Sequence, residues 1–251
     1  MKTSSLFIAS RERHAGSLLI SLGIMSMLRQ HYEKIAFYRP ITEDSNDADI
    51  QFINASFKLD LNINDMTGVT LAEAIQFLSS NNQHTLFEKL VQQFHQIKKQ
   101  YDFVLIQGME LTRQTTAIDF DINLELAKHF NIPYVSVLNG QGKSLPQIEQ
   151  EIDLEIQNCQ EVNPFAFFVN RVQTDIIGQS AKQHQVPVFY LPESENLDTP
   201  TVKEIADALD GEMLTPKGTA WNRLVKAPIV AAMTPEHYLP RINEGDLVIV
   251  P

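Results

Sequence analysis

The sequence is poor in cysteine, in basic residues and in long apolar runs. Cys159 is the single cysteine, so no disulfide can form within the chain, and this usage fits the reducing cytoplasm. Twenty Lys and Arg stand against 31 Asp and Glu, a formal net charge of −11, which argues against a nucleic-acid partner because affinity for a phosphate backbone needs clustered basic residues. Because no run of about 18 apolar residues occurs, we expect no membrane span and no membrane partner.

The N-terminal segment has the frame of a phosphate-binding loop. Residues 5–10 (SLFIAS) are typical of a buried strand, and Leu18–Arg29 of an apolar helix. Between them, residues 10–18 (SRERHAGSL) occupy the place of a G-x-x-x-x-G-K-[ST] loop, and Gly16 is its second glycine. This strand, loop and helix predict a nucleotide-binding fold.

The side chains of this loop argue against nucleotide hydrolysis. Ser10 replaces the first glycine, Ser17 replaces the lysine that neutralises phosphate, and Leu18 replaces the hydroxyl that binds Mg²⁺. Arg11 and Arg13 could restore positive charge for an anion without a metal, or they could be solvated loop residues. The sequence leaves both readings open.

A second element of the same metal site is also missing. Residues 101–108 (YDFVLIQG) predict a buried strand, and its carboxyl end carries Gln107 where an acidic residue would hold Mg²⁺ or water. An amide cannot act as a base and is a poor Mg²⁺ ligand. We therefore expect that ATP hydrolysis is lost, with no resident cofactor, no metal site and no catalytic residue in this chain.

Two further polar residues end predicted strands at the same crevice. Arg39 closes the second strand, and Asn170 follows the fifth, where its amide could bond a base edge or simply make a turn. The candidate nucleotide or anion site therefore consists of Ser10, Arg11, Arg13, Gly16, Ser17, Arg39, Gln107 and Asn170.

Short apolar runs alternate with helical patterns along the chain. The expected strands are Leu6–Ser10, Ile35–Tyr38, Phe103–Ile106, Tyr134–Leu138, Phe165–Val169 and Val188–Leu191. The expected helices are Leu18–Arg29, Leu71–Leu78, Leu86–Lys99, Ile122–Phe130, Leu145–Ile156, Ile176–His184 and Val202–Leu209. Because the strands do not alternate in polarity, they predict an α/β fold with a doubly wound, mostly parallel sheet.

Two segments depart from this rhythm. Residues 42–68 are rich in Asp and Asn and predict a long acidic loop after the second strand. The composition also changes near residue 211, which gives a first domain over 1–211, a linker over 212–223 and the beginning of a second, small α/β domain over 224–251. Two strands and a short helix are too few for a core of their own, so we expect the second domain to continue beyond Pro251.

These landmarks resemble the dethiobiotin-synthetase-like family of P-loop proteins. The matching stretches are SRERHAGSL, YRPI, YDFVLIQG and VNR. The chain is more similar still to the N-terminal domain of long bacterial phosphate acetyltransferases, through AGSLLISLGIM, FYRPI, IQGMELTRQ, INLELAKHFNIP, PFAFFVNRV, VPVFYLPE and LDTPTVKEIADAL. Its last part resembles the beginning of the domain named for its D-R-T-G-G motif, which would lie beyond Pro251.

The resemblance implies a function and partners. In that family a separate C-terminal domain of the same chain transfers the acetyl group between acetyl-CoA and phosphate. The N-terminal region is then a cytoplasmic regulatory or assembly module, with a homo-oligomeric state and a small-molecule effector as expectations. Two alternatives stay open: an active ATP-dependent ligase of the dethiobiotin or cobyrinate type, and a scaffold domain without a ligand.

Overall fold

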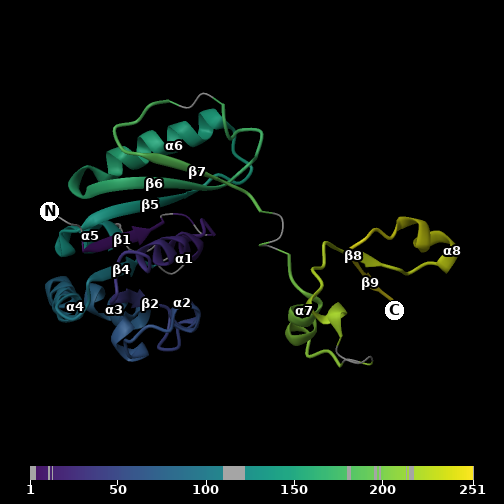
Figure 1. Cartoon of the computed structure of the whole chain (residues 1–251), viewed down its shortest axis with the longest axis horizontal. Coiled ribbons are helices and arrows are strands. Elements are labelled where there is room, and N and C mark those ends of the chain that lie inside the picture. The colour runs from purple at the N-terminus through teal and green to yellow at the C-terminus, as the bar shows by residue number, and fades with distance from the viewer. Residues whose placement is uncertain are drawn as a thin grey trace. The chain divides into compact units, whose positions relative to one another are not determined.

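The chain forms two compact units in the computed structural model, Met1–Glu193 and Ser194–Pro251 (Figure 1). The structure describes residues 4–10, 12, 14–109, 122–179, 182–194, 197, 199–212, 214 and 218–250. Within them, no helix combines the length and the apolar character needed to cross a membrane.

The first unit is built on a seven-stranded sheet in the order β3-β2-β4-β1-β5-β6-β7. Its strands are β1 Ser5–Ala9, β2 Ile35–Thr42, β3 Thr67–Thr70, β4 Phe103–Gln107, β5 Pro133–Asn139, β6 Asn163–Val172 and β7 Val188–Pro192. Every neighbouring pair is parallel. Six of the strands lie where short apolar runs predict them, so the doubly wound fold is confirmed.

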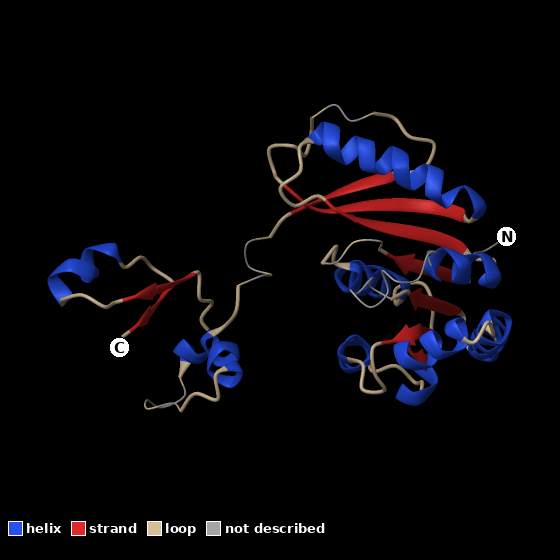
Figure 2. Cartoon of the chain, turned by 180° about the vertical axis from the view of Figure 1, so that it is seen from behind, coloured by secondary structure: helices blue, strands red, loops and turns tan. Residues whose placement is uncertain are grey.

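Helices cover both faces of this sheet (Figures 1 and 2). They are α1 Ser17–Leu28, α2 Ala48–Phe57, α3 Leu71–Ser79, α4 Gln83–Lys98, α5 Ile122–Phe130 and α6 Leu145–Asn158. Apolar side chains of α3 to α6 form one core against the sheet, and those of α1 and α2 form a second core on its other face. This two-sided burial explains why the central strands read as unbroken apolar runs.

The acidic segment 42–68 is not a long loop. It contains α2, a 3₁₀ turn over Ile63–Met66 and the edge strand β3. Asp47 starts α2, because its carboxylate accepts a hydrogen bond from the backbone N–H of Ile50. The Asp and Asn residues that suggested a loop therefore include a helix cap.

The predicted helix Ile176–His184 is also wrong in its described part. Residues 176–179 form turns, and residues 182–184 carry no regular structure. Gly178 has φ +98°, a left-handed conformation that interrupts a right-handed helix.

The second unit is small. It contains α7 Val202–Ala208, β8 Ala227–Val230, α8 Pro235–Tyr238 and β9 Asp246–Ile249, and β8 pairs with β9 in parallel. The N–H of Val202 bonds the carbonyl of Arg223, and Thr201 bridges Leu224, so α7 belongs with the residues that follow it. By compactness the chain divides at 193/194, and the domain boundaries at residues 211 and 223 stay a prediction from the sequence.

Candidate functional site

The loop between β1 and α1 ends at the glycine expected to allow a tight turn. Gly16 precedes α1 with φ +86° and ψ 35°, a conformation that favours glycine. Ser10 and Ser17 are buried on either side of the loop, and the hydroxyl of Ser17 has no hydrogen-bond partner among the described residues. The amide Nδ2 of Asn170, at the end of β6, donates to the carbonyl of Ala15 over 2.9 Å. Asn170 thus fastens the loop to β6, which is separated from β1 by β5 in the sheet.

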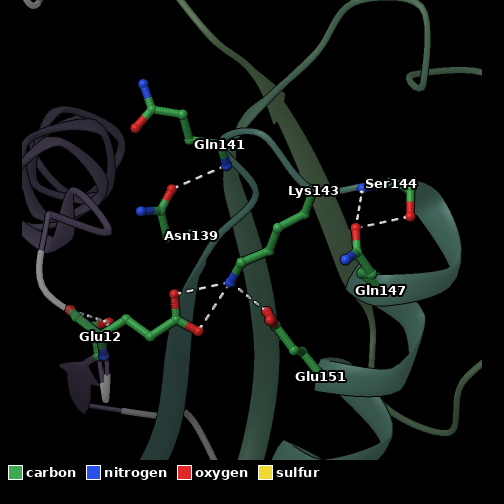
Figure 3. Close-up of polar contacts among 8 residues, drawn as sticks. Glu12, Asn139, Gln141, Lys143, Ser144, Gln147 and Glu151 are labelled. Atoms are coloured by element: carbon green, nitrogen blue, oxygen red, sulfur yellow. Dashed lines mark hydrogen bonds and ion pairs between the residues drawn. The ribbon is translucent and has the colours of Figure 1, made fainter.

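Glu12 lies in this loop and is bound by a lysine from the turn between β5 and α6. The Ser10 hydroxyl accepts from the Glu12 N–H (3.0 Å) and donates to the Glu12 carbonyl (2.9 Å). Lys143 Nζ donates to both carboxylate oxygens of Glu12 (3.0 and 3.2 Å) and to Glu151 of α6 (2.6 Å), as Figure 3 shows. In the loop where an intact P-loop would bind a phosphate, the Glu12 carboxylate of the chain itself therefore pairs with a lysine.

The turn from β5 into α6 places Lys143. Asn139 Oδ1 accepts from the Gln141 N–H over 3.0 Å, and Ser144 with Gln147 forms a capping box at the start of α6 (Figure 3). Partial burial opposes the charged lysine, but hydrogen bonds from Nζ to Glu151 and Glu12 prevail and raise the pKa of Lys143. Lys143 is therefore protonated at neutral pH.

Arg39 forms a second ion-pair network at the same edge of the sheet. Its guanidinium Nη1 lies 2.7 Å from Asp47 and 2.9 Å from Asp49. Gln107 of β4 adds a hydrogen bond from Nε2 to Asp49 Oδ2 over 2.9 Å. Arg39 is only 7% exposed, so its charge is committed to these carboxylates. The Nε of Arg39 and the Oε1 of Gln107 are buried without a partner among the described residues.

The pocket beside Arg39 is acidic. It has a volume of about 310 Å³, and its lining carries four carboxylates, Glu43, Asp44, Asp47 and Asp49, against the one guanidinium. A phosphate group entering it would meet net negative charge.

Two further contacts complete this edge. Arg171, with φ +62° near the end of β6, pairs with Glu193 over 3.2 Å, and Gln141 Nε2 donates to the same Glu193 carboxylate over 2.6 Å. On α5, the Asn123 side chain bonds both the N–H and the carbonyl of Met109 (3.1 and 2.9 Å), which holds the backbone just after β4.

Residues 4–214 match the family model described as AAA domain, and residues 204–251 match the model described as DRTGG domain. The first match covers well over half of the chain. The chain belongs to the AAA domain family. This membership and the sheet topology confirm the predicted resemblance to P-loop proteins.

The AAA-domain chain is also similar to phosphate acetyltransferases over its whole length. It is 27% identical over 265 residues to the one from Nitratidesulfovibrio vulgaris, with 99% of this chain and 38% of that protein covered. For the one from Synechocystis sp. the identity is 25% over 264 residues, covering 99% of this chain and 37% of that protein. The chain thus spans little more than a third of the length of these relatives.

A crystal structure of a plasmid partition protein from Borrelia burgdorferi B31, bound to AMPPNP, has a similar fold. The TM-score is 0.50 at 11% identity, with 85% of this chain and 93% of that chain covered. At this identity the likeness shows the fold alone.

Most of the predicted site residues of this AAA-domain chain lie at one edge of the sheet. Those described there are Ser10, Gly16, Ser17, Arg39, Gln107 and Asn170. Arg11 and Arg13 lie outside the described residues, and any binding role for the set stays a prediction. In the part of the chain that the structure describes, no three His, Cys, Asp or Glu residues gather as metal ligands would.

Three residues at this edge, Glu12, Lys143 and Asn123, are not among those predicted from the sequence. Lys143 follows a predicted strand in the run NGQGKS, so its place at a strand's carboxyl end was a signal that could have been used. The pairing of Lys143 with Glu12 had no local signal.

Proposed function

We propose that this chain is the N-terminal regulatory and assembly region of a phosphate acetyltransferase and does not itself hydrolyse ATP. The similarity to phosphate acetyltransferases runs from end to end of the chain but spans only 37–38% of those proteins. The reaction of acetyl-CoA with phosphate to give acetyl phosphate and CoA would then belong to a C-terminal domain of the same parent chain, which acts as the partner of this region.

One observation carries the proposal that nucleotide chemistry is absent. At the carboxyl edge of the sheet, the described basic side chains Arg39, Lys143 and Arg171 are each paired with carboxylates. A bound triphosphate with its Mg²⁺ needs the loop lysine and a metal-binding hydroxyl, and exchange of one of these ion pairs would free only a single cation. Ser17 and Leu18 supply neither, so neither a nucleotide nor a metal cofactor is expected here.

Calorimetry with Mg²⁺ and ATP tests this part of the proposal. We expect no micromolar binding and no release of phosphate above that of a heat-denatured sample. Turnover with a diamine or amino-acid substrate would instead establish the ATP-dependent ligase.

Thermal unfolding with added effectors tests regulation against a scaffold role. Nucleotides without metal, pyruvate and other small anions are screened at equal ionic strength. A ligand at about 100 times its dissociation constant stabilises the folded state by roughly 2.7 kcal/mol, which is easily measured. If no compound shifts the unfolding temperature, the ligand-free scaffold is supported. If replacing Arg11 and Arg13 with Ala abolishes a response, these two residues belong to the effector site.

A further inference from the structure

The loop after β1 holds an anion that belongs to the chain itself. In Figure 3 the Glu12 side chain extends from the loop toward Lys143, which lies between Glu12 and Glu151. The two carboxylates accept every hydrogen bond recorded for Lys143 Nζ. Glu12 and Lys143 are 131 positions apart in sequence, so the folded sheet brings them together.

The bond between Glu12 and Lys143 can be exchanged for another. The side chains of Lys143, Glu12 and Glu151 are 23%, 35% and 33% exposed, so water and small ions reach all three. Ion pairs of this exposure contribute little net free energy, because Coulomb attraction is screened and both side chains lose freedom. An external anion therefore displaces Glu12 at little cost.

The surroundings of Glu12 allow this exchange without rebuilding the loop. Ser10 holds the Glu12 backbone from both its N–H and its carbonyl, so only the side chain needs to leave. Glu151 lies on α6 and keeps Lys143 in place. The Ser17 hydroxyl is buried and has no partner among the described residues, and it belongs to the first turn of α1, where the helix dipole favours negative charge.

We propose that Lys143 is the cation of a self-occupied anion site, in which Glu12 competes with the ligand. Lys143 would do from the β5–α6 turn what the missing loop lysine does in an intact phosphate-binding loop. The ligand is a compact anion with at least two negative charges, either a phosphate or a dicarboxylate. This inference rests on the proposed regulatory function, because such a site senses an anion without turning it over.

The test measures anion binding by calorimetry on the whole chain, with inorganic phosphate and with malonate at constant ionic strength. Glu12→Gln keeps the shape of the side chain and removes its charge. We expect this variant to bind at least one of the two anions roughly fivefold or more tightly than the wild type, since one repulsive and competing charge is gone. Lys143→Met should lose binding in both backgrounds.

Matched controls use ion pairs away from the loop. Lys182→Met removes another lysine bound to a carboxylate, Asp153 at 2.8 Å, and Glu125→Gln removes a carboxylate bound to Lys128 at 3.1 Å. Neither should change anion binding. Unfolding by urea checks that all four variants are folded, and Lys143→Gln replaces Lys143→Met if the latter is not.

The outcomes separate the two proposals. Binding of phosphate alone or malonate alone supports the site and identifies the ligand chemistry. If Glu12→Gln binds no more tightly than the wild type, or if binding survives the loss of Lys143, the self-occupied site is wrong while the regulatory function stands. Hydrolysis or other turnover of ATP by the wild type in the presence of Mg²⁺ would overturn the regulatory function instead.

Discussion

Gly16 is the residue at which the retained loop shape is most sensitive to substitution. Its φ of +86° disfavours any side chain, and a Cβ would lie 2.3 Å from Asn170 Nδ2. We expect Gly16→Ala to lower the free energy of unfolding by about 2–3 kcal/mol, the sum of the left-handed backbone cost and a lost Asn170 hydrogen bond. Urea denaturation measures this loss.

Gly142→Ala is the matched control for Gly16→Ala. Its φ is +69°, and a Cβ there would meet nothing within 4 Å, so only the backbone cost of about 1 kcal/mol applies. If the two variants lose equal stability, Asn170 does not pack against the loop as described.

Arg39 differs from Gly16, because it contributes to stability through its charge and not through its backbone conformation. Removing it leaves Asp47 and Asp49 close together without their cation. We expect Arg39→Met to lower the free energy of unfolding by about 3 kcal/mol at pH 7. Asp49→Asn should lower the free energy of unfolding by clearly less, because Arg39 still pairs with Asp47. Denaturant titration of both variants measures the difference, and a loss under about 1 kcal/mol for Arg39→Met would contradict a committed ion pair.

At the scale of the element, α3 shows how a local cap depends on pH. Thr70 and Glu73 form a capping box, and the hydrogen bond from the Thr70 N–H to Glu73 Oε2 is the main reason why the pKa of Glu73 is lowered. A lowered folded-state pKa gives stability above the unfolded pKa near 4.5, and this stability is lost as the pH falls through the folded value.

Glu73→Gln tests the charge of this cap, since the amide keeps an acceptor. We expect the variant to be less stable than the wild type by about 0.3 kcal/mol at pH 7, a small amount because the site is exposed. The difference should vanish near pH 3. Unfolding curves at the two pH values measure it, and an equal difference at both would assign the effect to shape rather than charge.

The elements that could be predicted from the sequence are those whose burial is two-sided. Strands such as β4 and β5 read as apolar runs because both faces meet helices. The edge strand β3 is short and half-buried, and α2 begins at an Asp in an Asn-rich stretch, so neither had this signal. In the site, the sequence alone predicts the loss of the loop lysine at Ser17 and of the acidic residue at Gln107. It does not predict the pairing of Glu12 with Lys143, because only the folded sheet brings these two residues together.

At the scale of the whole molecule, the parallel topology collects charge at one edge of the sheet. Residues 12, 39, 143 and 171 are remote in sequence. Residues 12 and 143 follow β1 and β5, residue 171 lies near the end of β6, and Arg39 lies in the second half of β2, which runs past its predicted end to Thr42. In an intact P-loop protein the same geometry gathers groups that hold a metal and a triphosphate. Here it gathers ion pairs, in which the described basic side chains are bound to carboxylates of the same chain.

The two units should differ sharply in how often their backbone opens. Strands β1 and β4 are fully buried, while β8 is largely exposed and β9 is largely half-buried. Val225 and Ala231 are the buried apolar residues recorded for the described part of 194–251. Hydrogen exchange followed by mass spectrometry of the intact chain should show amides of β8 and β9 exchanging at least roughly 100-fold faster than those of β1 and β4. Equal protection would contradict the exposure of β8, and protection that falls on dilution would indicate burial against a second copy.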